Sequence, residues 1–315
     1  MTDEQKSNAD ILLCPGQGAQ QVGMGKAWFD ASSVAGDTFR AADEALGYPL
    51  STYCFEGPAE TLNRTDVAQP ALYVCTIAGY HALAQAGELN AMEAAAGLSL
   101  GEFTALHLAG AFDFADGLEL VRLRGEAMQQ AAEQSDSGMV ALVGADEGQA
   151  NELCERSLQQ SAADSVLVPA NFNCPGQVVV SGSKDACDHA LTVAEQMELR
   201  ATPLNVAGAF HSPLMQPAAD RLAEALEKVT WHSFNTTVLS NVTGKPHDGQ
   251  DVASIKQRLV EQLTNPVRWA DDMQWAIDNL SGRYVELPPG KVLSGLMRRI
   301  HKKTKVQNFA EPVNA

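Results

Sequence analysis

The chain has 315 residues and a mass of 33.6 kDa, more than one hydrophobic core usually organises, so a large domain carrying a smaller one is expected. Hydrophobic residues make up 45% and charged residues 19% of the sequence, which excludes disordered, collagenous and coiled-coil proteins. Asp and Glu outnumber Lys and Arg by 39 to 22, and the formal charge of −17 argues against a broad nucleic-acid-binding face.

The sequence has no sign of membrane insertion or export. Residues 1–6 lack the basic and apolar regions of a signal peptide, and no apolar run approaches the ~18 residues that span a bilayer. The six cysteines are far apart and form no C-x-x-C pair, so neither a zinc site nor a disulfide framework is indicated. We therefore expect a soluble, cytoplasmic protein, monomeric and without a membrane or nucleic-acid partner.

The first predicted elements alternate between strand, loop and helix. Residues 11–14 are typical of a short buried strand, a glycine-containing loop follows at 15–20, and helical patterns extend over about 24–47 and 69–87. This alternation predicts an α/β layer architecture.

Residues 138–204 form a block of their own. The predicted elements are a strand at 139–144, a helix ending at 158, strands at 166–171 and 177–181, a helix from 184 and a strand at 200–204. The order β-α-β-β-α-β is that of a ferredoxin-like unit. We therefore predict a small ferredoxin-like domain at 135–205, inserted into a large discontinuous α/β domain at 1–134 and 206–315.

Residues 97–101 match G-x-S-x-G, in which two glycines permit the sharp strand-to-helix turn that exposes a serine nucleophile, here Ser99. The same residues, followed by Glu102, also match a capping box, in which Ser99 would merely cap a helix. The motif alone does not decide between nucleophile and cap.

Arg124 lies in the predicted helix from 114 to 132. At 100° per residue it falls among the apolar residues Val121 and Met128, whereas Arg122 points to solvent. A core-facing guanidinium keeps its charge and needs an anion. That anion is either an internal Asp or Glu or the carboxylate of a substrate.

His211 lies just before Ser212 and Pro213, a strong start signal for a helix. The positive end of a helix dipole would keep its imidazole neutral near pH 7, as a general base requires. The alternative is a loop histidine that only contributes to the helix start.

The combination of motifs resembles the malonyl-CoA:acyl carrier protein transacylases of fatty acid synthesis, whose relatives are the acyltransferase domains of polyketide synthases. The resemblance covers residues 11 to about 300 and rests on these segments: Pro15-Gly16-Gln17-Gly18-Ala19-Gln20, residues 97–102, Arg124-Gly125, Asn173-Cys174-Pro175-Gly176-Gln177, Ala209-Phe210-His211-Ser212, residues 262–269 and Pro289-Gly290-Lys291-Val292-Leu293.

The resemblance implies an α/β-hydrolase-like large domain and a role for each matching residue. Ser99 would be the nucleophile and His211 its base, steadied by the backbone carbonyl of Gln262. The N–H groups of Gln17 and Leu100 would form the oxyanion hole.

The same resemblance implies the substrate-binding residues and the reaction. Arg124 would bind the substrate carboxylate, and Phe210 would either exclude branched substrates or simply pack in the core. The implied reaction is a ping-pong transfer of malonyl from malonyl-CoA to the phosphopantetheine thiol of acyl carrier protein, without a metal or bound cofactor.

The sequence departs from the family pattern at two positions. Leu98 replaces the usual His before the nucleophile, and Pro288 replaces the usual Gly of a Gly-Pro-Gly segment. Propensity would also make residues 94–96 helical, so the strand before Ser99 rests on the resemblance.

Six basic residues gather in fifteen positions that contain no acid: Lys291, Arg298, Arg299, Lys302, Lys303 and Lys305. This basic cluster either steers an acidic carrier protein or the phosphates of coenzyme A, or is a solvated helix end. Three other functions remain open: a trans-acting polyketide acyltransferase, a serine thioesterase or hydrolase, and a non-catalytic relative.

Overall fold

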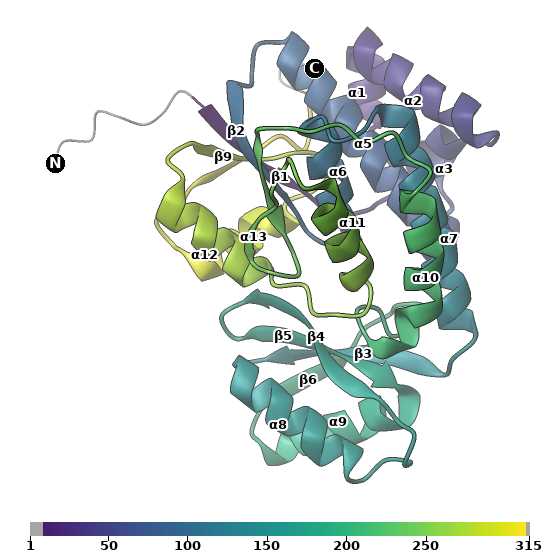
Figure 1. The fold of residues 1–315 in the computed structure, drawn as a ribbon, viewed down its shortest axis with the longest axis vertical. Helices are drawn as coiled ribbons and strands as arrows, with labels where there is room; N and C mark the ends of the chain where they lie inside the picture. The colour runs from purple at the N-terminus through teal and green to yellow at the C-terminus, as the bar shows by residue number, and fades with distance from the viewer. Residues whose placement is uncertain (1–8, 313–315) are drawn as a thin grey trace, which may run out of the picture.

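The computed structural model describes residues 9–312, and these fold around two β-sheets (Figure 1). The larger sheet has the strand order β10-β9-β1-β2-β7-β8 and the smaller one the order β4-β5-β3-β6. Helices cover both sheets, so the predicted α/β class is confirmed.

The larger sheet is parallel except between its last two strands. Its strands are β1 (Ala9–Cys14), β2 (Ala91–Gly97), β7 (Thr237–Ser240), β8 (Lys245–Pro246), β9 (Arg283–Glu286) and β10 (Val306–Asn308). The helices around it are α1 (Lys26–Ala31), α2 (Ser33–Leu46), α3 (Leu50–Glu56), α4 (Ala59–Leu62), α5 (Thr65–Gln85), α6 (Leu100–Leu108), α7 (Phe114–Glu133), α10 (Gln216–Leu226), α11 (Val252–Glu261), α12 (Trp269–Asn279) and α13 (Val292–Ile300), with a 3₁₀ turn, η1, at Pro213–Met215.

Strand β1 shows why the sheet is buried on both faces. Leu12 and Cys14 pack into the core cluster that includes α5, α6 and α7, whereas Ile11 and Leu13 pack into the cluster with α12 and α13. Successive side chains of a strand point to opposite faces, so a strand covered on both sides reads as a continuous apolar run. This is the pattern of residues 11–14.

The smaller sheet is antiparallel, and its elements follow the predicted order. They are β3 (Ser137–Val143), α8 (Glu147–Leu158), β4 (Leu167–Cys174), β5 (Gln177–Ser183), α9 (Lys184–Gln196) and β6 (Arg200–Pro203). Both helices lie on the face of this sheet that is turned away from the larger sheet (Figure 1). A separate apolar cluster fills the space between them and the sheet.

Backbone hydrogen bonds join the two parts. The amide of Phe172 in β4 donates to the carbonyl of Val267 over 2.9 Å, and the amide of Val267 donates to the carbonyl of Ala170 over 2.9 Å. The segment that follows α11 thereby runs alongside the edge of the smaller sheet. These bonds fix the chain at Val267, a few residues after the predicted site residue Gln262.

Two helical predictions need correction. The pattern at 24–47 forms two helices, because the chain is extended at Ser32, whose side chain caps α2 by accepting a hydrogen bond from the amide of Ala35 over 3.4 Å. The pattern at 69–87 begins earlier, at Thr65.

The alanine-rich strand before Ser99 is present as β2, paired with β1 and β7. Burial on both faces in the middle of the sheet overrides the helical preference of alanine. No helix among residues 9–312 is both long and apolar enough to cross a bilayer. Residues 1–6, in which a signal peptide was sought, lie outside the described part of the chain.

Candidate active site

Ser99 sits on a sharp turn between β2 and α6. Its backbone has φ 52° and ψ −101°, a conformation that side-chain-bearing residues rarely adopt. Both neighbouring glycines are required, because a Cβ on Gly97 would lie 1.8 Å from the carbonyl carbon of Gly101, and one on Gly101 would lie 2.1 Å from the carbonyl oxygen of Cys14. The elbow predicted from G-x-S-x-G is therefore formed.

The hydroxyl of Ser99 does not cap α6, so the capping-box interpretation is wrong. Its Oγ lies instead 2.9 Å from Nε2 of His211 and 3.0 Å from Nη2 of Arg124. Two side chains that are far from Ser99 in sequence thus converge on its hydroxyl oxygen.

The hydrogen bonds of His211 fix its tautomer. Its Nδ1 lies 2.7 Å from the main-chain oxygen of Gln262, and a carbonyl oxygen can only accept. In the neutral ring Nδ1 therefore carries the proton, which leaves Nε2 as the acceptor for the O–H of Ser99. This is the orientation that a general base needs.

The pKa of His211 is lowered to about 4, first by burial and then by the positive charge of Arg124, while the hydrogen bond to Gln262 raises it. The predicted cause, a helix dipole, needs correction. The residues after Ser212 form only the 3₁₀ turn η1, and α10 begins at Gln216. The imidazole is kept neutral by desolvation and by a neighbouring cation.

Arg124 is 1% exposed and is held by neutral side chains. Its Nη1 donates to Oε1 of Gln69 over 2.7 Å, and its Nη2 donates to Oε1 of Gln262 over 2.8 Å. Its Nε is buried without a hydrogen-bond partner, and within residues 9–312 no carboxylate forms an ion pair with the guanidinium. The internal ion pair considered from the sequence is therefore wrong, and burial lowers the pKa of Arg124.

The loop at 15–20 packs directly on the elbow. A Cβ on Gly16 would lie 2.1 Å from the carbonyl oxygen of Leu98, so the loop backbone can approach this closely only with glycine there. The amide of Ser99 is occupied, because it donates to Oδ1 of Asn241 over 2.6 Å. The amide of Leu100 is the first of α6, where intrahelical acceptors are absent.

The remaining predicted positions lie around this centre. Phe210 is buried in the large core cluster beside His211. Leu98 packs against the cluster on the α12 and α13 side. The carbonyl of Pro288 accepts a hydrogen bond from Oγ1 of Thr76 over 2.7 Å, and its ring lies against Gly79 of α5.

A buried polar network under the elbow was missed from the sequence. Glu102 on α6 accepts hydrogen bonds from Nε2 of Gln262 over 2.6 Å and from the amide of Asn241 over 3.1 Å, and its other oxygen lies 2.7 Å from Nε2 of His247. Asn241 also donates from Nδ2 to the carbonyl of Gly97 and to Asp272, whose carboxyl pKa is raised by burial. The only signal in the sequence was the acid of the capping-box motif.

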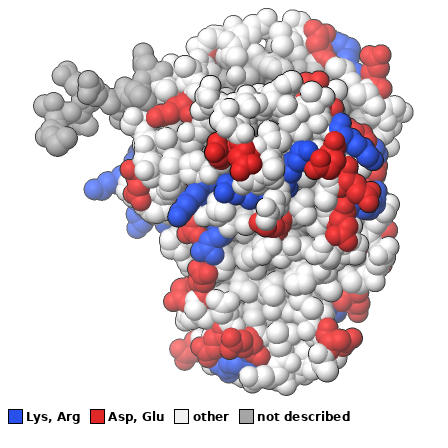
Figure 2. Space-filling view, viewed as in Figure 1, with Lys and Arg blue, Asp and Glu red and all other residues white. Residues whose placement is uncertain are grey.

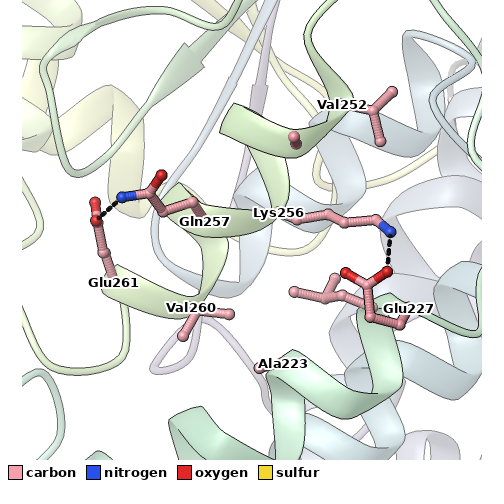
Figure 3. A pocket seen from close by; sticks show the side chains of 9 residues that line it. Ala223, Glu227, Val252, Lys256, Gln257, Val260 and Glu261 are labelled. Atoms are coloured by element: carbon pink, nitrogen blue, oxygen red, sulfur yellow. Dashed lines mark hydrogen bonds and ion pairs between the residues drawn. The ribbon is translucent and has the colours of Figure 1, made fainter.

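Two surface features lie apart from this centre. All six side chains of the basic cluster are exposed, and Figure 2 shows Lys and Arg side chains gathered over the region of α12 and α13. A groove of about 530 Å³ separates α10 from α11; Lys256 and Glu227 pair across it at 2.9 Å, and apolar residues such as Val260 line its floor (Figure 3). Neither Ser99 nor His211 lines this groove.

Comparison with known proteins places the chain among acyltransferases. A family model described as "Acyl transferase domain" matches residues 11–312. The chain is 39% identical over 302 residues to the malonyl CoA-acyl carrier protein transacylase of Escherichia coli K12, which covers 96% of both proteins.

Solved structures agree. The chain resembles the malonyl-CoA:acyl carrier protein transacylase of Xanthomonas oryzae pv. oryzae with a TM-score of 0.90, 39% identity and coverage of 98% and 96% of the two chains. It also resembles a malonyl-transacylase solved in complex with its type II PKS acyl-carrier protein, with a TM-score of 0.91, 35% identity and 96% coverage of each chain.

Proposed function

Because this chain belongs to the malonyl CoA-acyl carrier protein transacylases of the acyl transferase family, we propose that it moves malonyl from malonyl-CoA to the phosphopantetheine thiol of acyl carrier protein. The observation that carries the proposal is the buried, carboxylate-free guanidinium of Arg124, 3.0 Å from the hydroxyl of Ser99, which itself lies 2.9 Å from His211. A nucleophile, a base and an anion receptor thus share one small space.

The first half-reaction loads Ser99. The Oγ–H gives its proton to Nε2 of His211 as Oγ attacks the thioester carbonyl. The tetrahedral oxyanion accepts hydrogen bonds from the N–H groups of Leu100 and Gln17, each typically worth about 3 kcal/mol in the transition state. When the C–S bond breaks, the imidazolium returns the proton to the departing sulfur, which leaves as the thiol of coenzyme A.

The second half-reaction runs the same steps in reverse with another thiol. The phosphopantetheine thiol gives its proton to His211 and attacks the malonyl ester, and Ser99 leaves and takes that proton back. Every proton moves between Ser99, His211 and the two thiols, so the proposed cycle needs no metal and no bound cofactor.

Arg124 would bind the free carboxylate of malonyl in this scheme. A buried guanidinium that touches no carboxylate carries a desolvation cost that a bound carboxylate would relieve. Two-point hydrogen bonding by the planar guanidinium also fixes the orientation of the ester. Phe210 beside the base would then exclude branched acyl groups, a role that burial in the core neither requires nor contradicts.

The proposal extends to architecture and setting. We describe the larger part, 1–134 with 206–315, as an α/β-hydrolase-like domain, supported by the elbow and the parallel sheet. We describe 135–205 as an inserted ferredoxin-like domain, supported by its antiparallel order β4-β5-β3-β6. Six free, buried cysteines suit a reducing compartment, which supports a cytoplasmic location. We also propose a monomer, in which one chain supplies Ser99, His211 and Arg124 to the site.

The pathway depends on which acyl carrier protein receives the malonyl group, and we propose that it is fatty acid biosynthesis. A relative named "Polyketide biosynthesis malonyl CoA-acyl carrier protein transacylase" from Bacillus velezensis is 37% identical, so a trans-acting polyketide role is the second candidate. Comparing transfer rates to a fatty acid carrier protein and to a type II polyketide carrier protein distinguishes the two.

Intact-mass measurement tests the activity itself. Mixing the protein with malonyl-CoA should give one malonyl adduct that disappears on adding holo acyl carrier protein and never forms in Ser99→Ala. Rapid release of free malonate without transfer would show a thioesterase or hydrolase, and absence of any adduct would show a non-catalytic relative.

A further inference from the structure

Glu102 lies in the first turn of α6, three residues after Ser99, and none of its surface is exposed. Its Oε2 accepts from the side-chain amide of Gln262 over 2.6 Å and from the main-chain amide of Asn241 over 3.1 Å. Both donors are N–H groups that cannot accept. Burying a carboxylate costs free energy, so a fully buried one that contacts two loops of the site points to a role in the site itself.

Gln262 connects Glu102 to the reacting groups. Its side-chain Nε2 also donates to the main-chain oxygen of Ser99 over 3.1 Å, and its Oε1 accepts from Nη2 of Arg124 over 2.8 Å. Its main-chain oxygen accepts from Nδ1 of His211 over 2.7 Å. One residue thus touches the nucleophile's backbone, the base and the guanidinium.

The carboxylate of Glu102 and the main-chain oxygen of Ser99 together determine which way the Gln262 amide faces, and Glu102 accepts the shorter of the two hydrogen bonds, 2.6 Å against 3.1 Å. A side-chain amide has one accepting and one donating end, and the accepting carboxylate oxygen selects the donating end. The oxygen of the amide is then turned toward Arg124, where it holds Nη2. With the amide reversed, its NH₂ group would face the NH₂ group of the guanidinium, which would push Arg124 out of place.

We propose that Glu102 is a positioning residue that acts through Gln262, setting both the ring of His211 and the guanidinium of Arg124 against Ser99. This inference rests on the proposed malonyl transfer. The negative charge of Glu102 also stabilises the charged form of the buried Arg124, because it opposes the lowering of the Arg124 pKa by burial. Nε2 of His247 lies 2.7 Å from Oε1 of Glu102, the carboxylate oxygen that does not contact Gln262, and so holds the other side of the carboxylate.

Glu102→Gln tests this role, with single-turnover loading of Ser99 from malonyl-CoA and from acetyl-CoA as the readout. Acetyl loading needs the base alone, whereas malonyl loading needs the base and the guanidinium. Each loading rate is divided by the fraction of the protein that is folded. That fraction is measured from the amplitude of the cooperative unfolding transition. We expect malonyl loading to fall about 100-fold, as for reacting groups displaced by about 1 Å, and acetyl loading to fall clearly less.

A matched control and a double-mutant cycle separate positioning from folding. Glu286 is also fully buried, and it accepts hydrogen bonds from the amides of Leu293 and Ser294 at the start of α13. Glu286→Gln should lower stability but leave both loading rates per folded molecule unchanged. Gln262→Leu removes the connecting amide, so the double variant Glu102→Gln with Gln262→Leu should load malonyl no more slowly than the slower single variant.

The outcomes are distinguishable. If the wild-type protein forms no malonyl-Ser99 adduct, the proposed function fails and this inference fails with it. If the wild type loads normally but Glu102→Gln loads malonyl within about 2-fold of it per folded molecule, or loses malonyl and acetyl loading equally, only the positioning role is overturned. Multiplicative losses in the double variant would also overturn action through Gln262. If Glu102→Gln does not fold, Glu102→Asp, which keeps the charge but withdraws it from Gln262, is judged by the same criteria.

Discussion

Arg124 donates a hydrogen bond from Nη2 to Oγ of Ser99 across 3.0 Å, so a buried positive charge touches the proposed nucleophile. The contact has two consequences. The nearby charge of Arg124 lowers the pKa of His211 in addition to burial, and the contact holds one edge of a guanidinium whose Nε has no hydrogen-bond partner in the described chain. A carboxylate entering this space gains a guanidinium that is already desolvated and oriented.

Arg124→Ala should lower malonyl loading of Ser99 by at least about 100-fold more than acetyl loading, because only malonyl uses the charge-assisted hydrogen bonds. The measurement is single-turnover adduct formation with each thioester, followed by intact mass. Arg122→Ala is the matched control: it lies on the same helix, but its side chain is 28% exposed and its guanidinium pairs with Glu119 over 2.6 Å and with Glu126. Equal losses with the two thioesters in Arg124→Ala would contradict the clamp.

The acid limb of the loading rate should lie near pH 4 and not near the ordinary histidine value of about 6.5. The base works only when Nε2 is unprotonated, and burial with the Arg124 charge keeps it so down to that pH. The profile of kcat/KM for malonyl-CoA between pH 3.5 and 8 measures it. A half-maximal point near 6.5 would show that the ring is solvated.

The lowered pKa of His211 also predicts how the stability of the protein depends on pH. The folded pKa of His211 lies below its unfolded value, so the unfolded chain takes up the proton first as pH falls. The free energy of unfolding should therefore be unaffected above about pH 6.5 and should decrease between there and pH 4. His211→Gln, compared by urea unfolding at pH 7 and 5, should lose part of this dependence; an identical pH dependence in both proteins would contradict it.

The sequence carried the elements whose signal is local. The apolar run at 11–14, the two glycines around Ser99 and the alternating block at 138–204 each follow from backbone sterics or from burial on known faces, and all three are found in the structure. Helical periodicity also placed Arg124 inward, where it is 1% exposed. Periodicity could not identify the anion that Arg124 binds. Choosing between a substrate carboxylate and an internal one requires knowing which side chains surround the guanidinium.

Interactions between distant segments were beyond the sequence. Asn241 lies 142 positions from Ser99, yet it accepts the hydrogen bond of the Ser99 amide. The sequence allows a capping role for Glu102 because S-x-x-E is a common local pattern, whereas its partners in the structure are Gln262, His247 and the amide of Asn241. The break at Ser32 was missed because periodicity continued through it. In each case tertiary contacts decided what local preference left open.

Gly101→Ala should abolish loading or prevent folding, because the new Cβ would lie 2.1 Å from the carbonyl oxygen of Cys14, and backbone atoms cannot yield. Gly295→Ala in α13 is the control: its Cβ meets nothing within 4 Å, and alanine should stabilise that helix by about 0.5–1 kcal/mol. Thermal unfolding and adduct formation measure both. A Gly101→Ala protein with normal loading would show that the elbow tolerates a shift of the 97–101 turn.

The basic cluster should govern the second half-reaction and not the first. Its side chains are exposed over the α13 region (Figure 2), and this gathering of six cations on a chain with formal charge −17 would attract a negatively charged carrier protein. In the double variant Lys302→Glu with Lys303→Glu, transfer from malonyl-Ser99 to carrier protein should slow by about 10-fold or more at low salt, and its salt dependence should flatten. Loading from malonyl-CoA should change little. Charge reversal of Lys26 on α1 is the control and should leave the transfer rate unchanged. A transfer rate that is insensitive to salt in both the wild type and the double variant would show that the basic cluster is only a solvated helix end.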